Sequence, residues 1–206
     1  MKKPIFVFLL GVLMFSSCKT YYFENPQPSH TRELKSFPSE LIGTYFELNA
    51  DTIKHENEDP LVITDDSYNY KTGEPMLRDM KKEGSLKPGK VVLKKVKKYY
   101  ILSQKVKNPL ENSPDSLWEV YAIKYKDNQL AIYSMIYSDE NGGLKVDSTE
   151  RINNKLLSDS IRTIVSVKEH RVDNDMYYLI NPSKKQFIAL LENNLFRKIL
   201  EFEKVK

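Results

Sequence analysis

Hydrophobic and polar residues alternate in short runs after about residue 37, and Asn, Asp, Gly and Pro separate these runs. A period of two is typical of β-strands, because successive side chains point to opposite faces. The pattern therefore predicts a mainly β fold: an antiparallel meander, as a barrel or sandwich, with one C-terminal helix and a terminal strand. Strands are expected at Leu41–Leu48, Leu61–Thr64, Ser67–Lys71, Lys90–Lys95, Tyr99–Val106, Leu117–Lys126, Gln129–Ser138, Leu144–Ser148, Ser160–Lys168, Met176–Ile180 and Phe196–Val205.

Helical spacing is clearest over Ser183–Asn193. Ser183 and Gln186 have the spacing of a capping box at its start. The residues that share its apolar face are Phe187, Leu190 and Leu191. A shorter helix could form over 74–84. The tail after residue 195 could extend the C-terminal helix, but its charged residues alternate outward, and this favours a strand.

The clearest hairpin joins Leu117–Lys126 to Gln129–Ser138 through Asp127 and Asn128. Both turn residues tolerate a positive φ, which a type I′ turn requires twice. A two-residue turn fixes the register, so the numbers of opposed residues sum to 255. Both faces of this hairpin are then apolar, whereas a half-exposed hairpin would have one polar face.

A second layer must therefore cover the other apolar face of the hairpin. The helix at 183–193 is the favoured cover, because its own apolar face needs a partner. The alternative is an aromatic pocket for a small apolar ligand. The candidate ligand-binding residues are Trp118, Tyr133, Met135 and Tyr137.

The N-terminus has a different pattern. Two lysines precede an apolar run of eleven residues over 5–15, and two serines and Cys18 follow. The run is too short to span a bilayer, which takes about 20 residues, and it suits the apolar segment of a secretory signal peptide. Cys18 is the only cysteine, so a disulfide framework is excluded.

The segment Phe15-Ser16-Ser17-Cys18 resembles the lipobox of bacterial lipoproteins, in the form with Phe found in Bacteroidota. The resemblance implies that Cys18 receives a diacylglyceryl thioether and becomes the first residue after cleavage. Several acyl chains anchor a protein stably, so the first expected partner is a membrane. An ordinary signal peptide with an incidental cysteine is the less favoured alternative, because the single cysteine stands where the lipobox needs it.

This interpretation divides the chain into a signal peptide at 1–17, a lipid-anchored tether at 18–37 and one β-rich domain at 38–206. Removing residues 1–17, with two lysines, lowers the formal charge from +4 to +2, so net charge does not argue for a nucleic-acid partner. In Bacteroidota lipoproteins an acidic cluster just after the cysteine marks export to the cell surface. Lys19 stands there in this chain, so the resemblance implies the periplasmic face of the outer membrane.

The domain also resembles the lipocalins in architecture. A short turn at 37–42 precedes Gly43-Thr44-Tyr45, which stands where lipocalins have Gly-x-Trp, and a meander, a helix and a last strand follow. The Leu-Ile-Gly-Thr-Tyr opening is similar to that of small Bacteroidota lipoproteins. The lipocalin resemblance implies a β-barrel that carries a small apolar molecule.

Residues suited to catalysis do not form a known motif. The histidines are His30, His55 and His170, and none has a metal-binding partner at helical or hairpin spacing. The anchor would consume the cysteine. Dispersed carboxylates leave a glycosidase as a residual hypothesis; they are Asp147, Glu150, Asp173 and Asp175. We therefore expect no enzyme, no cofactor and no metal.

Lysine is concentrated between residues 81 and 107, where Glu83 is the only acid. Solvated strand edges explain this run, and contact with an anionic lipid or glycan is the alternative. Two functions remain from different classes: a non-enzymatic envelope lipoprotein that scaffolds or contacts another envelope protein, and a lipocalin-like carrier of a small apolar ligand.

Overall fold

The computed structural model describes residues 18–48, 60–70, 83–87, 89–108, 116–138, 148–172 and 175–205. Within these ranges the fold is mainly β, as the alternation predicts: fourteen strands form one curled, largely antiparallel sheet, and two helices pack against it.

The strands are β1 (Cys18–Phe23), β2 (Glu33–Leu34), β3 (Gly43–Glu47), β4 (Leu61–Ile63), β5 (Ser67–Asn69), β6 (Glu83–Ser85), β7 (Val91–Val96), β8 (Tyr99–Val106), β9 (Leu117–Lys126), β10 (Gln129–Ser134), β11 (Ile136–Ser138), β12 (Val167–Val172), β13 (Asp175–Ile180) and β14 (Arg197–Lys204). The helices are α1 (Ser148–Ile164) and α2 (Lys184–Glu192).

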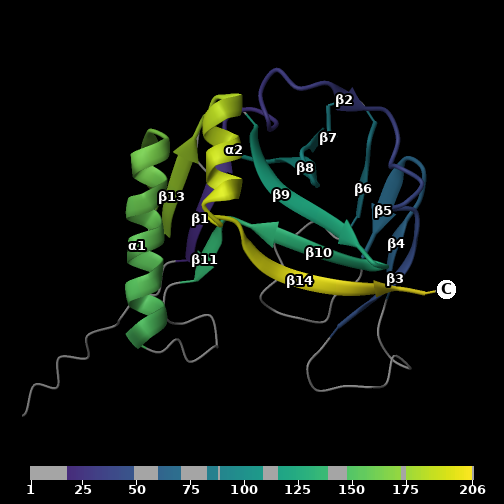
Figure 1. Cartoon of the computed structure of the whole chain (residues 1–206). Helices are drawn as coiled ribbons and strands as arrows, with labels where there is room; N and C mark the ends of the chain where they lie inside the picture. Colours follow the sequence, from purple (N-terminus) through teal and green to yellow (C-terminus); the bar gives the residue numbers. More distant parts are fainter. Residues whose placement is uncertain are drawn as a thin grey trace, which may run out of the picture.

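The sheet has two parts that meet at β9. Strands β7, β8, β9, β10, β14, β3, β4, β5 and β6 follow one another in space and curl into a half-barrel. Strand β1 pairs with the start of β9, opposite β8 and along the same edge that β10 occupies further on, and β13 and β12 continue the sheet beyond β1. The half-barrel and the extension through β1 and β13, with α1 and α2 beside it, are distinct in Figure 1. Among the described residues no ladder joins β6 to β7, so the barrel stays open there.

The hairpin of β9 and β10 has the expected turn and register. Asp127 and Asn128 both have positive φ, 53° and 65°. The Cα pairs from Gln129–Lys126 to Tyr133–Ala122 all sum to 255. Beyond Tyr133 the expectation is wrong, because the predicted strand breaks near Met135 and β11 turns away to pair with β1. Residue Trp118 consequently faces Phe23 of β1.

Helix α2 covers the outer face of this hairpin, as favoured from the sequence. Phe187, Leu190 and Leu191 are buried and belong to one apolar cluster with Val120 and Met135 of the hairpin region. The other face of the hairpin lines the half-barrel interior. Each apolar face therefore has its own core.

The start of α2 forms the predicted capping box. The Ser183 backbone N–H donates to Gln186 Oε1 at 2.9 Å, and the Gln186 backbone N–H donates to Ser183 Oγ at 3.4 Å. The Gln186 side chain does more than the sequence indicates, because its Nε2 donates to the Ile164 carbonyl at the end of α1, at 2.7 Å. One amide therefore links the two helices.

We expect Gln186→Glu to lower the free energy of unfolding by about 1–2 kcal/mol. The carboxylate retains the acceptor of the capping box, but it cannot donate to the Ile164 carbonyl. Urea unfolding followed by circular dichroism measures the loss. Lys185→Gln, at the exposed neighbouring position, is the control and should change stability by less than about 0.5 kcal/mol. Equal stability of the Gln186→Glu variant and wild type would show that this link contributes nothing.

The strand predicted at Ser160–Lys168 is wrong, because α1 continues to Ile164 and β12 begins at Val167. Ile161 and Val165 are buried with the α2 cluster, at helical spacing. The β-branched residues of this stretch gave it a strand-like local preference, and packing against the sheet overrides it.

Two other expected elements lie wholly or mostly outside the described residues. Of the short helix at 74–84, only residues 83 and 84 are described, and they belong to β6. Of the strand at Leu144–Ser148, only Ser148 is described, and it opens α1.

The expected tether at 18–37 is also wrong, because these residues belong to the fold. Strand β1 lies inside the sheet, parallel to β13 and antiparallel to β11 and β9. Tyr21, Phe23 and Phe37 are each at most 3% exposed. The Tyr21 ring stacks on Tyr178 of β13, with centroids 5.0 Å apart.

The proline-containing stretch after β1 is held on the outer face of β7 and β8. Lys94, only 5% exposed, donates from Nζ to the carbonyls of Pro26 and Pro28 at 3.2 and 3.1 Å. Ser103 Oγ accepts from the Gln27 backbone N–H at 2.9 Å. Burial lowers the Lys94 pKa, and nearby Glu33 partly offsets this effect. Lys94 of the basic run therefore holds the proline-containing stretch on the sheet, and it is not a solvated residue at a strand edge.

Candidate functional site

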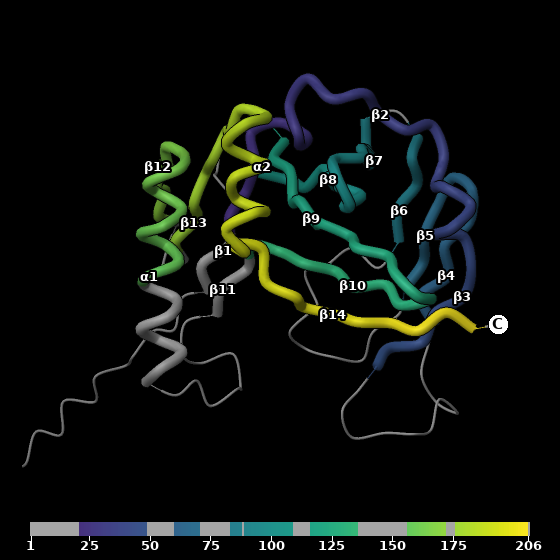
Figure 2. The backbone as a smooth tube through the Cα atoms, viewed as in Figure 1, coloured from purple at the N-terminus to yellow at the C-terminus, as the bar shows by residue number. Residues whose placement is uncertain are grey.

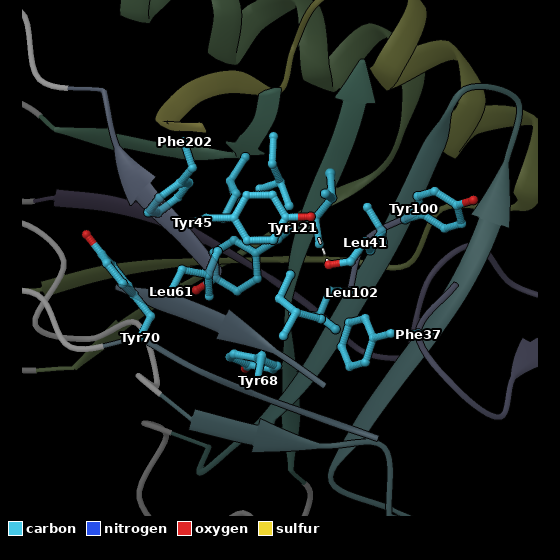
Figure 3. Packing of buried hydrophobic residues seen from close by; sticks show 14 of the residues in the cluster. Phe37, Leu41, Tyr45, Leu61, Tyr68, Tyr70, Tyr100, Leu102, Tyr121 and Phe202 are labelled. Atoms are coloured by element: carbon cyan, nitrogen blue, oxygen red, sulfur yellow. Dashed lines mark hydrogen bonds between the residues drawn. The ribbon is translucent and has the colours of Figure 1, made fainter. Parts of the chain in front are cut away.

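The half-barrel interior is filled by its own side chains. Tyr45, Leu41, Leu102, Phe202 and neighbouring aromatic rings pack across it (Figure 3). The Tyr45 hydroxyl donates to the Leu41 carbonyl at 2.9 Å. Among the described residues, the cavity left between these side chains has a volume of about 30 Å³, and Gln104 lines it together with apolar and aromatic side chains. This is room for about one or two water molecules and far below the 300 Å³ or more of typical small-molecule sites.

The four candidate aromatic and methionine residues lie in different surroundings. Met135 is 1% exposed in the core beneath α2. Tyr133 is half-buried, with its ring edge-on to Tyr99 at 6.2 Å between centroids. Tyr137 lies in β11, where its Cα pairs with that of Lys19, and its side chain is outside the described part of the chain. Trp118 is half-buried; it packs against the α2 core and also lines a large hollow.

This hollow of about 680 Å³ is the candidate site. It lies where the far end of β1 meets β12, β13 and the segments that flank β8 and β9. The tube in Figure 2 shows how the chain brings β1 and β13 beside the start of β9. The residues that line it are Glu24, Asn25, Lys105, Asn108, Ser116, Leu117, Trp118, Lys168, His170 and Leu179.

Strand alternation places the basic residues of β12 in the hollow. Glu169 forms an ion pair with Arg162 of α1, so its side chain lies on the helix-covered face of the strand. Lys168 and His170 alternate with it and therefore point to the opposite face. Leu179 of β13, the Cα partner of Lys168, lines the hollow beside them.

A polar network fixes the edge of the hollow. Lys168 Nζ donates to Glu24 Oε1 at 2.7 Å, and Asn181 Nδ2 donates to Glu24 Oε2 at 3.0 Å. Asn25 Nδ2 donates in turn to Asn181 Oδ1 at 3.3 Å. Both oxygens of the carboxylate are thus engaged, while Lys168 remains 65% exposed. The ammonium group of Lys168 is therefore accessible to a polar ligand at the edge of the hollow.

A second, smaller hollow of about 320 Å³ lies between the β7–β8 turn and α2. Ile188, Leu191 and Tyr99 line it, and an ion pair between Lys97 and Glu192 crosses the same region. It contains fewer groups able to orient a ligand than the hollow at β1.

No group of three or more His, Cys, Asp and Glu residues in the described part of the chain could hold a metal ion. His170 lines the hollow, whereas His30 is exposed after the proline-containing stretch. His55 and the carboxylates suggested for glycosidase chemistry have side chains outside the described residues.

The sequence indicates only Trp118 of the residues that line the hollow as a ligand contact. The others come from segments near 24, 105–118, 168–170 and 179, so no local motif could reveal them. The parallel pairing of β1 with β13 brings residues more than 150 positions apart together. To predict this site from the sequence, one would first have to predict a strand at Cys18–Phe23.

No protein-family model, curated protein or solved structure matches the chain. Within the described residues, neither helix has the length and apolar character needed to cross a bilayer.

Proposed function

We propose that this protein is a lipid-anchored lipoprotein of the bacterial cell envelope whose β domain binds another envelope component. The observation that carries the proposal is the apolar run that ends at Ser16-Ser17-Cys18. The anchor makes the membrane its first partner, and the outer membrane, on the side facing the periplasm, is the proposed location. Its role is binding rather than catalysis.

Two features of the fold support a binding role. The interior leaves only about 30 Å³, so the described core favours contact with a partner over transport of an enclosed ligand. The hollow beside β1 offers charged, amide and aromatic groups within about 680 Å³. A surface site of this kind suits a scaffold or interaction module.

The anchor is tested by Cys18→Ala. Wild type is expected in the membrane fraction and to incorporate a fatty-acid label, whereas the variant should move to the soluble fraction and lose the label. The loss follows because no other cysteine can carry the thioether. Lys19→Gln, one residue away, should behave like wild type. Membrane retention of the alanine variant, together with an unlabelled wild type, would reject the anchor.

The binding role is tested by crosslinking in cells and by native mass spectrometry of the full chain. A reproducible second component supports the interaction module. An extra mass of a few hundred daltons, buried in the half-barrel, would instead support the carrier. For that result the packed interior of Tyr45, Leu102 and Phe202 would have to open.

A further inference from the structure

We infer that the smaller hollow, between the β7–β8 turn and α2, binds the free C-terminus of a polypeptide whose last side chain is apolar. This site is separate from the hollow beside β1, so the inference goes beyond the proposed function. Its volume of about 320 Å³ lies at the lower end of the usual range of small-molecule sites. The residues that line it are Val96, Lys97, Lys98, Tyr99, Ile188, Leu191, Glu192 and Asn194.

An apolar floor forms where one edge of α2 meets the end of the β7–β8 hairpin. Ile188 and Leu191 are three residues apart in the helix and therefore share one side of it. Val96 and Tyr99 are Cα partners, so their side chains lie on the same face of the hairpin. That is the face covered by α2, because all four residues pack in the α2 cluster. One apolar side chain of a ligand can pack on this floor.

The charges around the floor favour a carboxylate. Two lysines and one glutamate line the hollow, so its formal charge is +1. Lys97 forms an ion pair with Glu192, and these two charges offset each other. Lys98 has no acidic partner in the described part of the chain, and its Nζ lies 5.5 Å from the centroid of the Tyr99 ring. An unpaired ammonium group therefore lies beside the apolar floor, and the last residue of a polypeptide can contact both.

The polar group at the other end of the hollow favours a peptide over a lipid. Asn194 follows the end of α2, and none of the described residues bonds to its side-chain amide. This amide can donate to and accept from the backbone of an extended peptide. The helix end opposes the carboxylate only weakly, because the Leu191 carbonyl already accepts from the Asn194 backbone N–H at 3.2 Å. An acyl chain would instead cover the Asn194 amide with hydrocarbon, which costs free energy.

The experiment measures the fluorescence anisotropy of a hexapeptide, Ser-Gly-Ser-Gly-Ala-Leu, that carries fluorescein at its N-terminus. It is added to full-length protein in detergent micelles. We expect saturable binding of the free acid that weakens as salt is raised, because charged contacts are screened. The C-terminal amide of the same peptide removes the charge and should bind at least roughly tenfold more weakly. A final serine in place of leucine removes the apolar contact and should weaken binding by roughly tenfold.

Two variants of the protein should change the binding of the free acid in opposite directions. Lys98→Gln should weaken it by roughly tenfold. Glu192→Gln should tighten it by roughly threefold, because it frees Lys97 for the carboxylate. Lys126→Gln is the matched control and should leave binding unchanged, because Lys126 is an exposed lysine at the β9–β10 turn. Circular dichroism verifies that each variant is folded.

Equal affinity for the free acid and the amide would overturn the inference, as would equal effects of Lys98→Gln and Lys126→Gln. A response to phosphatidylglycerol vesicles that Lys98→Gln weakens, without binding of the peptide, would also overturn it and would assign the hollow to lipid. None of these results depends on Cys18, so a failed peptide assay and a failed anchor assay are distinguishable.

Discussion

Replacing Phe187 by alanine is expected to lower the free energy of unfolding by about 3–5 kcal/mol. The side chain is fully buried where α2 meets the sheet. Its ring lies edge-on to Phe23 of β1, at 6.2 Å between centroids, and to Phe196 at 5.6 Å. Truncation leaves a cavity that joins β1, α2 and the start of β14, and the fixed backbone of the sheet limits its collapse.

Urea unfolding measures this loss, and Trp118 fluorescence gives a second readout because Trp118 packs against the same cluster. Its emission should shift to longer wavelength if α2 loosens. Ile188→Ala, on the half-buried side of the same helix, should cost about 1 kcal/mol. A Phe187→Ala loss below about 1 kcal/mol would mean that α2 does not seal the second face of the β9–β10 hairpin.

Raising the pH above 10 should unfold the domain. Burial raises the pKa of the Tyr45, Tyr68 and Tyr121 hydroxyls above the ordinary value of 10.0. The Glu119 carboxylate raises the pKa of Tyr68 and Tyr121 further, and Tyr121 donates to it at 2.9 Å. These groups stay protonated in the folded chain at a pH where the unfolded chain ionises.

The direction in which stability changes with pH follows from the number of protons that the folded and unfolded states bind. Below pH 10 both states hold the phenolic protons and stability is complete; above it the unfolded state releases them first and is favoured. Each buried tyrosine contributes a slope of about 1.4 kcal/mol per pH unit, so three give about 4. Lys94 opposes this effect, because its lowered pKa makes the folded state release a proton before the unfolded state does. One lysine does not offset three tyrosines.

Urea midpoints at pH 8, 9, 10 and 11 measure the effect, and absorbance at 295 nm follows phenolate formation. Tyr68→Phe should reduce the slope above pH 10 by about 1.4 kcal/mol per unit. Stability that stays level to pH 12 would contradict the burial of these hydroxyls.

What the sequence predicts correctly is local. The β9–β10 hairpin depends on Asp127 and Asn128, and the start of α2 on Ser183 and Gln186, all close in sequence to the structure they determine. The last strand, β14, also follows from alternation, with Phe202 fully buried. In each case neighbouring residues and distant packing favour the same conformation.

The predictions are wrong where contacts between residues distant in sequence determine the local conformation. Pro26 and Pro28 give their segment the composition of a linker, yet Lys94, about 66 positions away, satisfies their carbonyls. Ile161 and Val165 favour a strand locally, but the core beneath α1 accepts them at helical spacing. The hollow at β1 is likewise formed by segments that are distant in sequence. Of the residues that line it, the sequence suggested only Trp118 as a ligand contact.

The position of Cys18 as the first residue of β1 has a mechanical consequence for an anchored protein. A flexible linker of about 20 residues would let the domain wander roughly 25 Å from its lipid. Because β1 is paired with β11 and β13, it does not allow this movement. The acyl chains would therefore fix the distance and the tilt of the whole sheet relative to the bilayer. Glu24 follows the six residues of β1, roughly 20 Å from the cysteine. The hollow would then meet only components that approach the bilayer to within about that distance.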